Sequence, residues 1–169
     1  MKRLFFGIEP DHETRQRCTI IMQALSSQKN RPVPAANLHV TLLFLGLIEP
    51  AKESALLEEA ATVAFPQLTI TFDQLSYWQK PGILCLTASG IAPRLLALVD
   101  QLSTIAKKLA VTVDGRPYQA HVTLVRKARQ AVELVFDPVS WQADSFCLFE
   151  SCPSENGVEY RVLKRWPME

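Results

Sequence analysis

His39-Val40-Thr41-Leu42 is repeated in this chain as His121-Val122-Thr123-Leu124, and the two tetrapeptides hold two of its three histidines. Each copy lies in a run of apolar and β-branched residues, which predicts a strand. Side chains of a strand alternate between its faces, so His and Thr share one face while Val and Leu share the other. The repeat therefore predicts two imidazoles and two hydroxyls presented by matching halves of one fold.

Each tetrapeptide also ends a similar strand–helix unit. The first unit is predicted as a strand, a helix, a polar loop and the motif strand, at residues 4–8, 11–26, 27–37 and 38–45, with Gly46 and Pro50 closing the last strand. The second unit repeats this order at residues 83–87, 92–109, 114–117 and 120–125. Two such units predict an α+β, bilobal fold with two pseudo-symmetric lobes, each a β-sheet flanked by outer helices. Val and Leu of each motif would face the helices, and the active-site cleft would lie between the sheets.

The rest of the chain completes this architecture. A further helix is predicted at residues 52–64, with Leu56, Leu57 and Ala60 on its apolar face, and further strands at 68–75, 132–136, 144–150 and 158–163. The first helix is expected to bury Ile20, Ile21 and Leu25. A chain of 169 residues can bury a real core, and we expect residues 1–169 to form a single bilobal domain.

Composition excludes several classes of protein. Hydrophobic residues make up 48% and charged residues 21%, which argues against a disordered chain, and the formal net charge of +1 provides no global field for nucleic acid. No apolar run approaches the ~20 residues of a membrane span. The four cysteines (Cys18, Cys85, Cys147 and Cys152) form no C-x-x-C pair, so we expect free or buried thiols, a reducing cytoplasmic location and no contact with membranes.

The repeated residues suit in-line displacement at phosphorus. One imidazole can act as a general acid while the other acts as a general base, because the histidine pKa lies near neutrality. The hydroxyls of Thr41 and Thr123 can hydrogen-bond the non-bridging phosphate oxygens, where negative charge accumulates. The chain offers no D-x-D or H-E-x-x-H motif, so we expect no metal and no cofactor.

A cation is expected beside the phosphate, and Arg126 is the best candidate because a guanidinium binds phosphate oxygens bidentately. Strict alternation would point Arg126 away from His121, so it needs a strand end or a β-bulge to reach the site. The alternative is a solvated surface charge. Tyr77, Trp78 and Tyr118 could stack on a base or simply pack, and His12 is expected at the surface.

With these residues in place, the chain resembles the two-histidine phosphoesterase superfamily, and more closely the bacterial RNA 2′,3′-cyclic phosphodiesterases (2′-5′ RNA ligase or LigT-like family). The resemblance covers nearly the whole length and rests on both tetrapeptides with their flanking residues. The flanking segments are Arg3-Leu4-Phe5-Phe6, Asn37-Leu38, Phe44-Leu45-Gly46, Val125-Arg126 and Leu163-Lys164-Arg165-Trp166.

The resemblance implies metal-independent opening of an RNA-terminal 2′,3′-cyclic phosphate to a 2′-phosphomonoester, with reverse 2′-5′ ligation as the opposite direction. It implies that His39 donates a proton to the leaving 3′-oxygen and that His121 accepts a proton from water. Thr41, Thr123 and Arg126 would bind the phosphate. The expected partner is RNA with a cyclic phosphate end, tRNA fragments among the candidates, and we expect a monomer.

Three other functions stay open from the sequence. The enzyme could act on small cyclic nucleotides or on 2′-5′ oligonucleotides instead. The chain could be an RNA-binding module without catalysis, although both tetrapeptides are intact. A zinc site is a weaker hypothesis, since two histidines alone leave such a site short of ligands.

Overall fold

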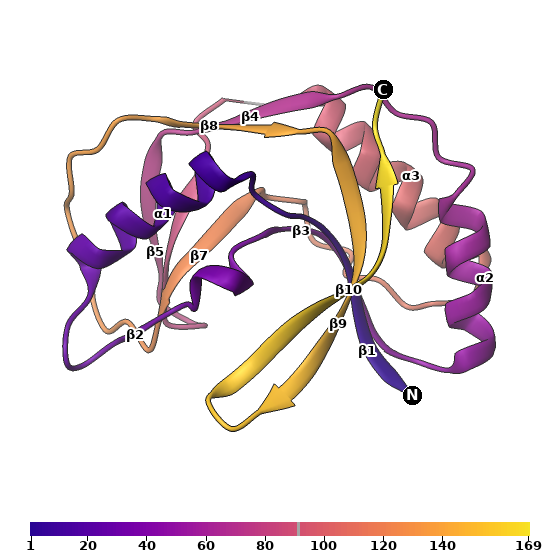
Figure 1. The fold of residues 1–169 in the computed structure, drawn as a ribbon, viewed down its shortest axis with the longest axis horizontal. Coiled ribbons are helices and arrows are strands. Elements are labelled where there is room, and N and C mark those ends of the chain that lie inside the picture. Colours follow the sequence, from indigo (N-terminus) through magenta and orange to yellow (C-terminus); the bar gives the residue numbers. More distant parts are fainter. Residues whose placement is uncertain (91) are drawn as a thin grey trace.

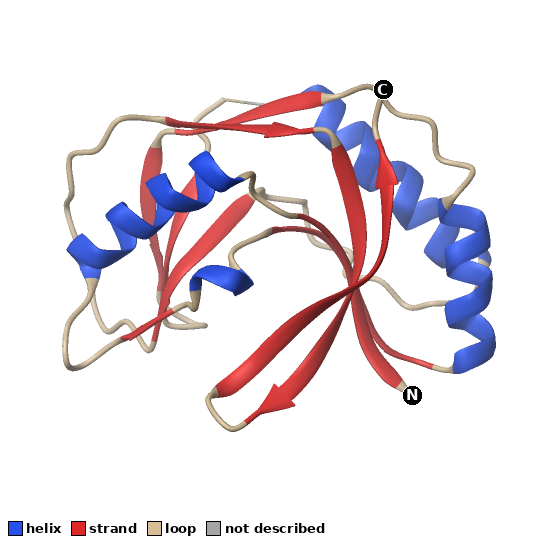
Figure 2. Cartoon of the chain, viewed as in Figure 1, coloured by secondary structure: helices blue, strands red, loops and turns tan. Residues whose placement is uncertain are grey.

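The α+β architecture predicted from the sequence is confirmed. The computed structural model describes residues 1–90 and 92–169, in which strands and helices alternate in the first half and strands dominate the second (Figures 1 and 2). The helices are α1 (His12–Leu25), a short 3-10 helix η1 (Ala35–Asn37), α2 (Pro50–Ala60) and α3 (Pro93–Lys108). The strands are β1 (Lys2–Ile8), β2 (Arg31–Pro32), β3 (Val40–Ile48), β4 (Leu68–Phe72), β5 (Gln74–Trp78), β6 (Ile83–Thr87), β7 (His121–Arg126), β8 (Val139–Ala143), β9 (Ser145–Ser154) and β10 (Gly157–Pro167).

Two four-stranded sheets carry the repeat. Sheet A has the strand order β10-β9-β1-β3, sheet B has the order β2-β7-β6-β5, and β4 pairs with β8 in a separate ribbon. Every pairing is antiparallel, and in each sheet the motif strand lies beside the strand that opens its unit, β3 beside β1 and β7 beside β6. β3 also contacts β7, so the two motif strands bring the sheets together.

The helices are exchanged between the two units. α1 follows β1 in the chain but packs against β7 and β8, whereas α3 follows β6 but packs against β3 and β4. Figure 1 shows α1 on one side of the molecule and α2 with α3 on the other. Each half of the repeat therefore depends on the other half to cover its sheet.

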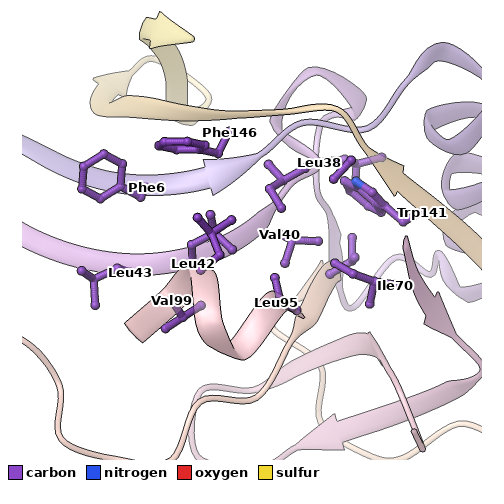
Figure 3. Close-up of a cluster of buried hydrophobic side chains, with 14 of the residues drawn as sticks. Phe6, Leu38, Val40, Leu42, Leu43, Ile70, Leu95, Val99, Trp141 and Phe146 are labelled. Carbon is purple, nitrogen blue, oxygen red and sulfur yellow. The ribbon is translucent and has the colours of Figure 1, made fainter. Parts of the chain in front are cut away.

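The main core lies between these helices and the covered faces of the sheets. Val40 and Leu42 of the first motif and Val122 and Leu124 of the second are all buried in it, as alternation predicts. Figure 3 shows Val40 and Leu42 pointing toward Leu95 and Val99 of α3. Burying each such side chain stabilises the fold by roughly 1.5–3 kcal/mol, so the Val and Leu letters of the motif serve folding.

Both motif strands contain a β-bulge at the same letter of the motif. In β7, Thr123 pairs with Cys85 and Val125 with Leu84, which leaves Leu124 as the extra residue. In β3, Thr41 pairs with Gly7 and Leu43 with Phe6, which leaves Leu42 as the extra residue. A bulge shifts the alternation by one, so the residues beyond it change faces.

Four expectations for individual elements were wrong. Residues 132–136 form no strand, and Val135 is fully exposed. The single strand expected at 68–75 is two strands, β4 and β5, in different sheets. Gly46 does not close the first motif strand, because β3 continues through it at a φ of +75° to Ile48. Ile20 is 66% exposed on α1, although Ile21 and Leu25 are buried.

Candidate active site

His39 lies immediately before β3 and is held by hydrogen bonds at both ring nitrogens. Its Nδ1–H donates to the backbone oxygen of Asn37 at 2.7 Å, so the neutral ring leaves Nε2 as the acceptor. The Thr41 hydroxyl lies 2.9 Å from this Nε2 and donates to it. The predicted pairing of His and Thr on one face is confirmed here, and the Nε2 atom points along the face that Thr41 occupies.

His121 opens β7 in the same ring orientation. Its Nδ1 lies 3.1 Å from the backbone oxygen of Gln119, again two residues earlier, and donates a hydrogen to it. Thr123 follows on the same face, half-buried. The indole of Trp78 packs on the imidazole with ring centroids 4.5 Å apart. The two histidines thus share one tautomer, which leaves each Nε2 as the nitrogen available for chemistry.

An aromatic cluster supports His39 on the face of sheet A opposite the main core. The His39 ring lies 5.0 Å from Phe5 and 4.9 Å from Tyr160 between ring centroids, and Phe5 stacks on Phe149 at 4.9 Å. The side chain of Asn37 adds a second tie, because its Nδ2 donates to Val158 O at 2.6 Å and its Oδ1 accepts from Tyr160 N. β10 is thereby fixed beside the residue that orients His39.

The electrostatic surroundings of both histidines favour the neutral ring and attract an anion. Burial, together with the positive charges of His121 and Arg126, lowers the pKa of His39 to about 4. Burial and the charge of Arg126 lower the pKa of His121. The charge of His121 contributes to the lowered pKa of His39, and the charge of Arg126 contributes to the lowered pKa of both histidines.

The β-bulge at Leu124 places Arg126 on the histidine face. Leu124 and Val125 are both buried, and Arg126 is exposed at the end of β7. The sequence required a bulge or a strand end for this residue to reach the site, and the structure contains both.

Phe44 occupies the place in β3 that Arg126 occupies in β7, and sequence reasoning missed it. Each residue lies five positions beyond its motif histidine and follows the β-bulge of its strand. The side chain of Phe44 is 61% exposed, and the centroid of its ring lies 5.8 Å from that of Phe5. An exposed phenyl ring beside Phe5, which itself packs on His39, presents a flat apolar surface to a ligand. Extending the alignment of the two repeats by two letters would have found it.

Several other candidates have structural roles. The hydroxyl of Tyr118 donates to Thr41 O at 2.7 Å and ties the segment before β7 to β3. Tyr77 packs against the core, and Trp166 is buried in it, while Arg165 pairs with Glu9. His12 is exposed, and all four cysteines are buried and free. A large concavity between β4, β8 and the start of α3 contains neither motif histidine.

In residues 1–90 and 92–169, no group of three or more His, Cys, Asp or Glu side chains is placed to hold a metal ion. None of the described helices has both the length and the apolar character needed to cross a membrane.

Comparison with known proteins gives consistent matches. A family model described as "LigT like Phosphoesterase" matches residues 8–85. The RNA 2′,3′-cyclic phosphodiesterase of Escherichia coli (strain K12) is 32% identical over 99% of this chain and 97% of its own length. The enzyme of the same name from Archaeoglobus fulgidus is 28% identical over 85% of this chain and 83% of its own. The crystal structure of E. coli LigT complexed with 3′-AMP is similar with a TM-score of 0.89, at 31% identity, over 99% of this chain and 98% of that one.

Proposed function

This chain belongs to the family of LigT-like phosphoesterases, and we propose that it hydrolyses the 2′,3′-cyclic phosphate at the end of an RNA strand to a 2′-phosphomonoester. Two relatives are named RNA 2′,3′-cyclic phosphodiesterases, and the similar crystal structure of E. coli LigT contains 3′-AMP. The observation that carries the proposal is the matched pair of His39 and His121, each with Nδ1 bonded to a backbone oxygen, beside one guanidinium whose charge reaches both.

The proposed mechanism uses the two Nε2 atoms on opposite sides of the phosphorus. The hydrogen bond to Gln119 O is made by Nδ1 of His121, so its Nε2 is free. This Nε2 accepts a proton from water as the water oxygen attacks phosphorus. The bond from phosphorus to O3′ breaks, and Nε2–H of His39 supplies the proton that O3′ needs. Arg126 binds the non-bridging oxygens, and the Thr41 and Thr123 hydroxyls donate to them.

The acid role of His39 requires it to gain a proton when substrate binds. A ring with a pKa of about 4 is neutral at pH 7 in the free protein. An anionic phosphate beside the ring raises that pKa, because it stabilises the imidazolium that burial and the nearby cations disfavour. Protonated Nε2 no longer accepts from Thr41, so the Thr41 hydroxyl turns to the phosphate.

Phe44 gives the proposed site a surface for the terminal base. The Phe44 ring is exposed and lies next to the aromatic cluster that packs on His39. In the described structure no other element covers this ring. Every nucleobase has a flat face that stacks on such a ring, so this contact holds the terminal nucleoside without selecting a sequence.

The decisive experiment identifies the product. An oligoribonucleotide ending in a 2′,3′-cyclic phosphate should yield a 2′-phosphomonoester, and His39→Ala or His121→Ala should each lower turnover by about 10²–10⁴-fold. A 3′-phosphate product, or full activity in either variant, would contradict the proposal. Tight binding of the oligonucleotide without turnover would instead identify an RNA-binding module.

Two finer points belong to the same proposal. We expect turnover to survive EDTA, because the scheme uses no metal; loss on chelation and recovery with added metal would overturn this point. Supplying an RNA with a 5′-hydroxyl in place of water should produce a small amount of 2′-5′ linkage, because this hydroxyl attacks phosphorus as water does, with His121 accepting its proton and His39 protonating the leaving O3′.

The setting of the reaction is also proposed. Four free, buried cysteines suit a reducing compartment such as the cytoplasm. We propose a monomer in which residues 1–169 act as one bilobal domain, and tRNA fragments are a candidate source of the cyclic phosphate ends.

A further inference from the structure

A second arginine lies in the same row of sheet B as Arg126. β2 pairs with β7 so that Arg31 is directly opposite Arg126, and on the other side of β7 Arg126 is opposite Ile83, which is opposite Trp78. Directly paired residues of antiparallel strands point to the same face of the sheet. Arg31 therefore shares the face that carries His121, Arg126 and the indole of Trp78.

The guanidinium of Arg31 also lies close to a residue of the other sheet. A Cβ added to Gly157, at the tip of the β9–β10 hairpin, would lie 3.8 Å from Nη1 of Arg31. Arg31 thus extends from the outer edge of sheet B to the hairpin of sheet A. Figure 1 shows β2 and the free end of this hairpin along the same side of the molecule.

The two arginines form a like-charged pair without carboxylate partners. In the described part of the chain neither Arg31 nor Arg126 has an ion pair or a side-chain hydrogen bond, and Glu155 at the hairpin tip forms no ion pair with Arg31. Like charges directly opposite each other on one face destabilise a sheet. A polyanion bound across both guanidinium groups would remove that repulsion.

The two guanidinium groups differ in their distance from the chemistry. The charge of Arg126 lowers the pKa of both His39 and His121, whereas Arg31 contributes to neither. Arg31 is also at the outermost strand of the sheet, one strand further from Trp78 than Arg126. It is placed for an anion beyond the reacting phosphate rather than for the reacting phosphate itself.

From this geometry we propose that Arg31 binds the phosphodiester on the 5′ side of the terminal nucleotide, so that an RNA strand leaves the site between β2 and the β9–β10 hairpin. The inference rests on the proposed function, since it takes the reacting phosphate to lie at His39, His121 and Arg126. It makes Arg31 the residue that favours RNA ends over mononucleotides, which carry no such phosphodiester.

The test compares two substrates in one variant. In Arg31→Gln, kcat/KM for a dinucleotide ending in a 2′,3′-cyclic phosphate should fall about tenfold or more relative to kcat/KM for the nucleoside 2′,3′-cyclic monophosphate, the loss of one charge-assisted contact. Arg31→Lys should keep part of the preference, because it keeps the charge. Lys107→Gln, the same charge change on the outer helix α3, should leave both values unchanged.

Binding measurements make the result independent of turnover. Arg31→Gln should weaken the binding of a dinucleotide 2′-phosphate more than the binding of a nucleoside 2′-monophosphate. For the dinucleotide, the plot of the logarithm of the association constant against the logarithm of the salt concentration should become less steep by about 0.7. Equal losses for both ligands, or no loss for the dinucleotide, would overturn the assignment of Arg31. Failure of the wild-type protein to hydrolyse either cyclic phosphate would instead contradict the proposed function, while the binding comparison would still decide the role of Arg31.

Discussion

At the scale of single residues, His39 combines two demands that oppose each other. It is held rigidly by Asn37 O and Thr41 and packed against Phe5 and Tyr160, which fixes the position of Nε2. The same packing removes water from the ring and lowers its pKa to about 4. As a result, the free energy of unfolding of the protein without substrate depends on whether His39 is charged.

This dependence predicts a specific pH profile. Unfolded His39 titrates near pH 6.5 and folded His39 near 4, so between these values the unfolded state binds more protons and stability falls as the pH is lowered. The contribution is fully present above pH 6.5 and amounts to up to about 3 kcal/mol. His39→Gln should lose less free energy of unfolding than wild type from pH 6.5 to 4, measured by urea titration. Parallel profiles of the two proteins would contradict the burial of a neutral ring.

Phe44 supports a second prediction at this scale. Phe44→Ala should lower kcat/KM for the cyclic phosphate substrate about tenfold, since stacking on an aromatic ring contributes roughly 1–3 kcal/mol per base. The melting temperature should hardly change, because the ring is largely exposed. Leu47→Ala is the matched control: Leu47 is 59% exposed on the same face of β3, further from His39. Equal effects of the two substitutions would argue against stacking.

At the scale of elements, the two β-bulges determine which residues beyond the repeated tetrapeptides share a face with the motif histidines. Without the extra Leu42, strict alternation would turn Phe44 to the face of β3 that α3 covers, and without the extra Leu124 it would turn Arg126 to the face of β7 that α1 covers. The identical placement of both bulges preserves the symmetry of the strands, while the residues beyond them differ, one aromatic and one cationic. The repeat thus presents two different contacts from two equivalent positions.

Two glycines near these bulges give a matched pair of predictions. A Cβ on Gly7 would lie 2.9 Å from Val40 O and 3.2 Å from Phe149, so Gly7→Ala should separate β1 from β3 next to His39. We expect a loss of about 1–3 kcal/mol and a marked fall in turnover. Gly46→Ala has open space but a φ of +75°, so it should cost about 1–2 kcal/mol without affecting turnover. Unfolding and kinetic assays on both variants separate these outcomes; undiminished turnover in Gly7→Ala would sink the first.

The errors in the sequence prediction also belong to this scale. Residues 132–136 have apolar residues in a strand-like pattern, but they pair with no strand in the described structure, and strand pairing is invisible in a local pattern. Residues 68–75 read as one strand, yet at Asp73 the chain moves from β4 to a different sheet, where the carboxylate accepts from Ser89 N at 2.8 Å. The tetrapeptides were predictable because a period of two and a repeat both mark them.

At the scale of the whole molecule, the sequence predicted two similar units but not the exchange of their helices. Each unit contains a strand–helix–strand order that is compatible with a helix covering its own sheet. Which sheet each helix covers depends on how the two motif strands meet. Where they meet, the hydroxyl of Tyr118 in the second unit donates a hydrogen bond to the backbone oxygen of Thr41 in the first. This contact between residues distant in sequence carries no local signal.

The exchange predicts that neither lobe is stable without the other. Sheet A loses α3 if the second unit unfolds, and sheet B loses α1 if the first does, so both should unfold in one transition. Trp78 reports on sheet B and Trp166 on sheet A, so Trp141→Phe combined with Trp166→Phe or with Trp78→Phe leaves one reporter per sheet. In each variant, tryptophan fluorescence and far-UV circular dichroism should give the same urea midpoint. A fluorescence midpoint that precedes the dichroism midpoint in one variant and follows it in the other would show that the lobes unfold separately, and residues 1–169 would then be two domains.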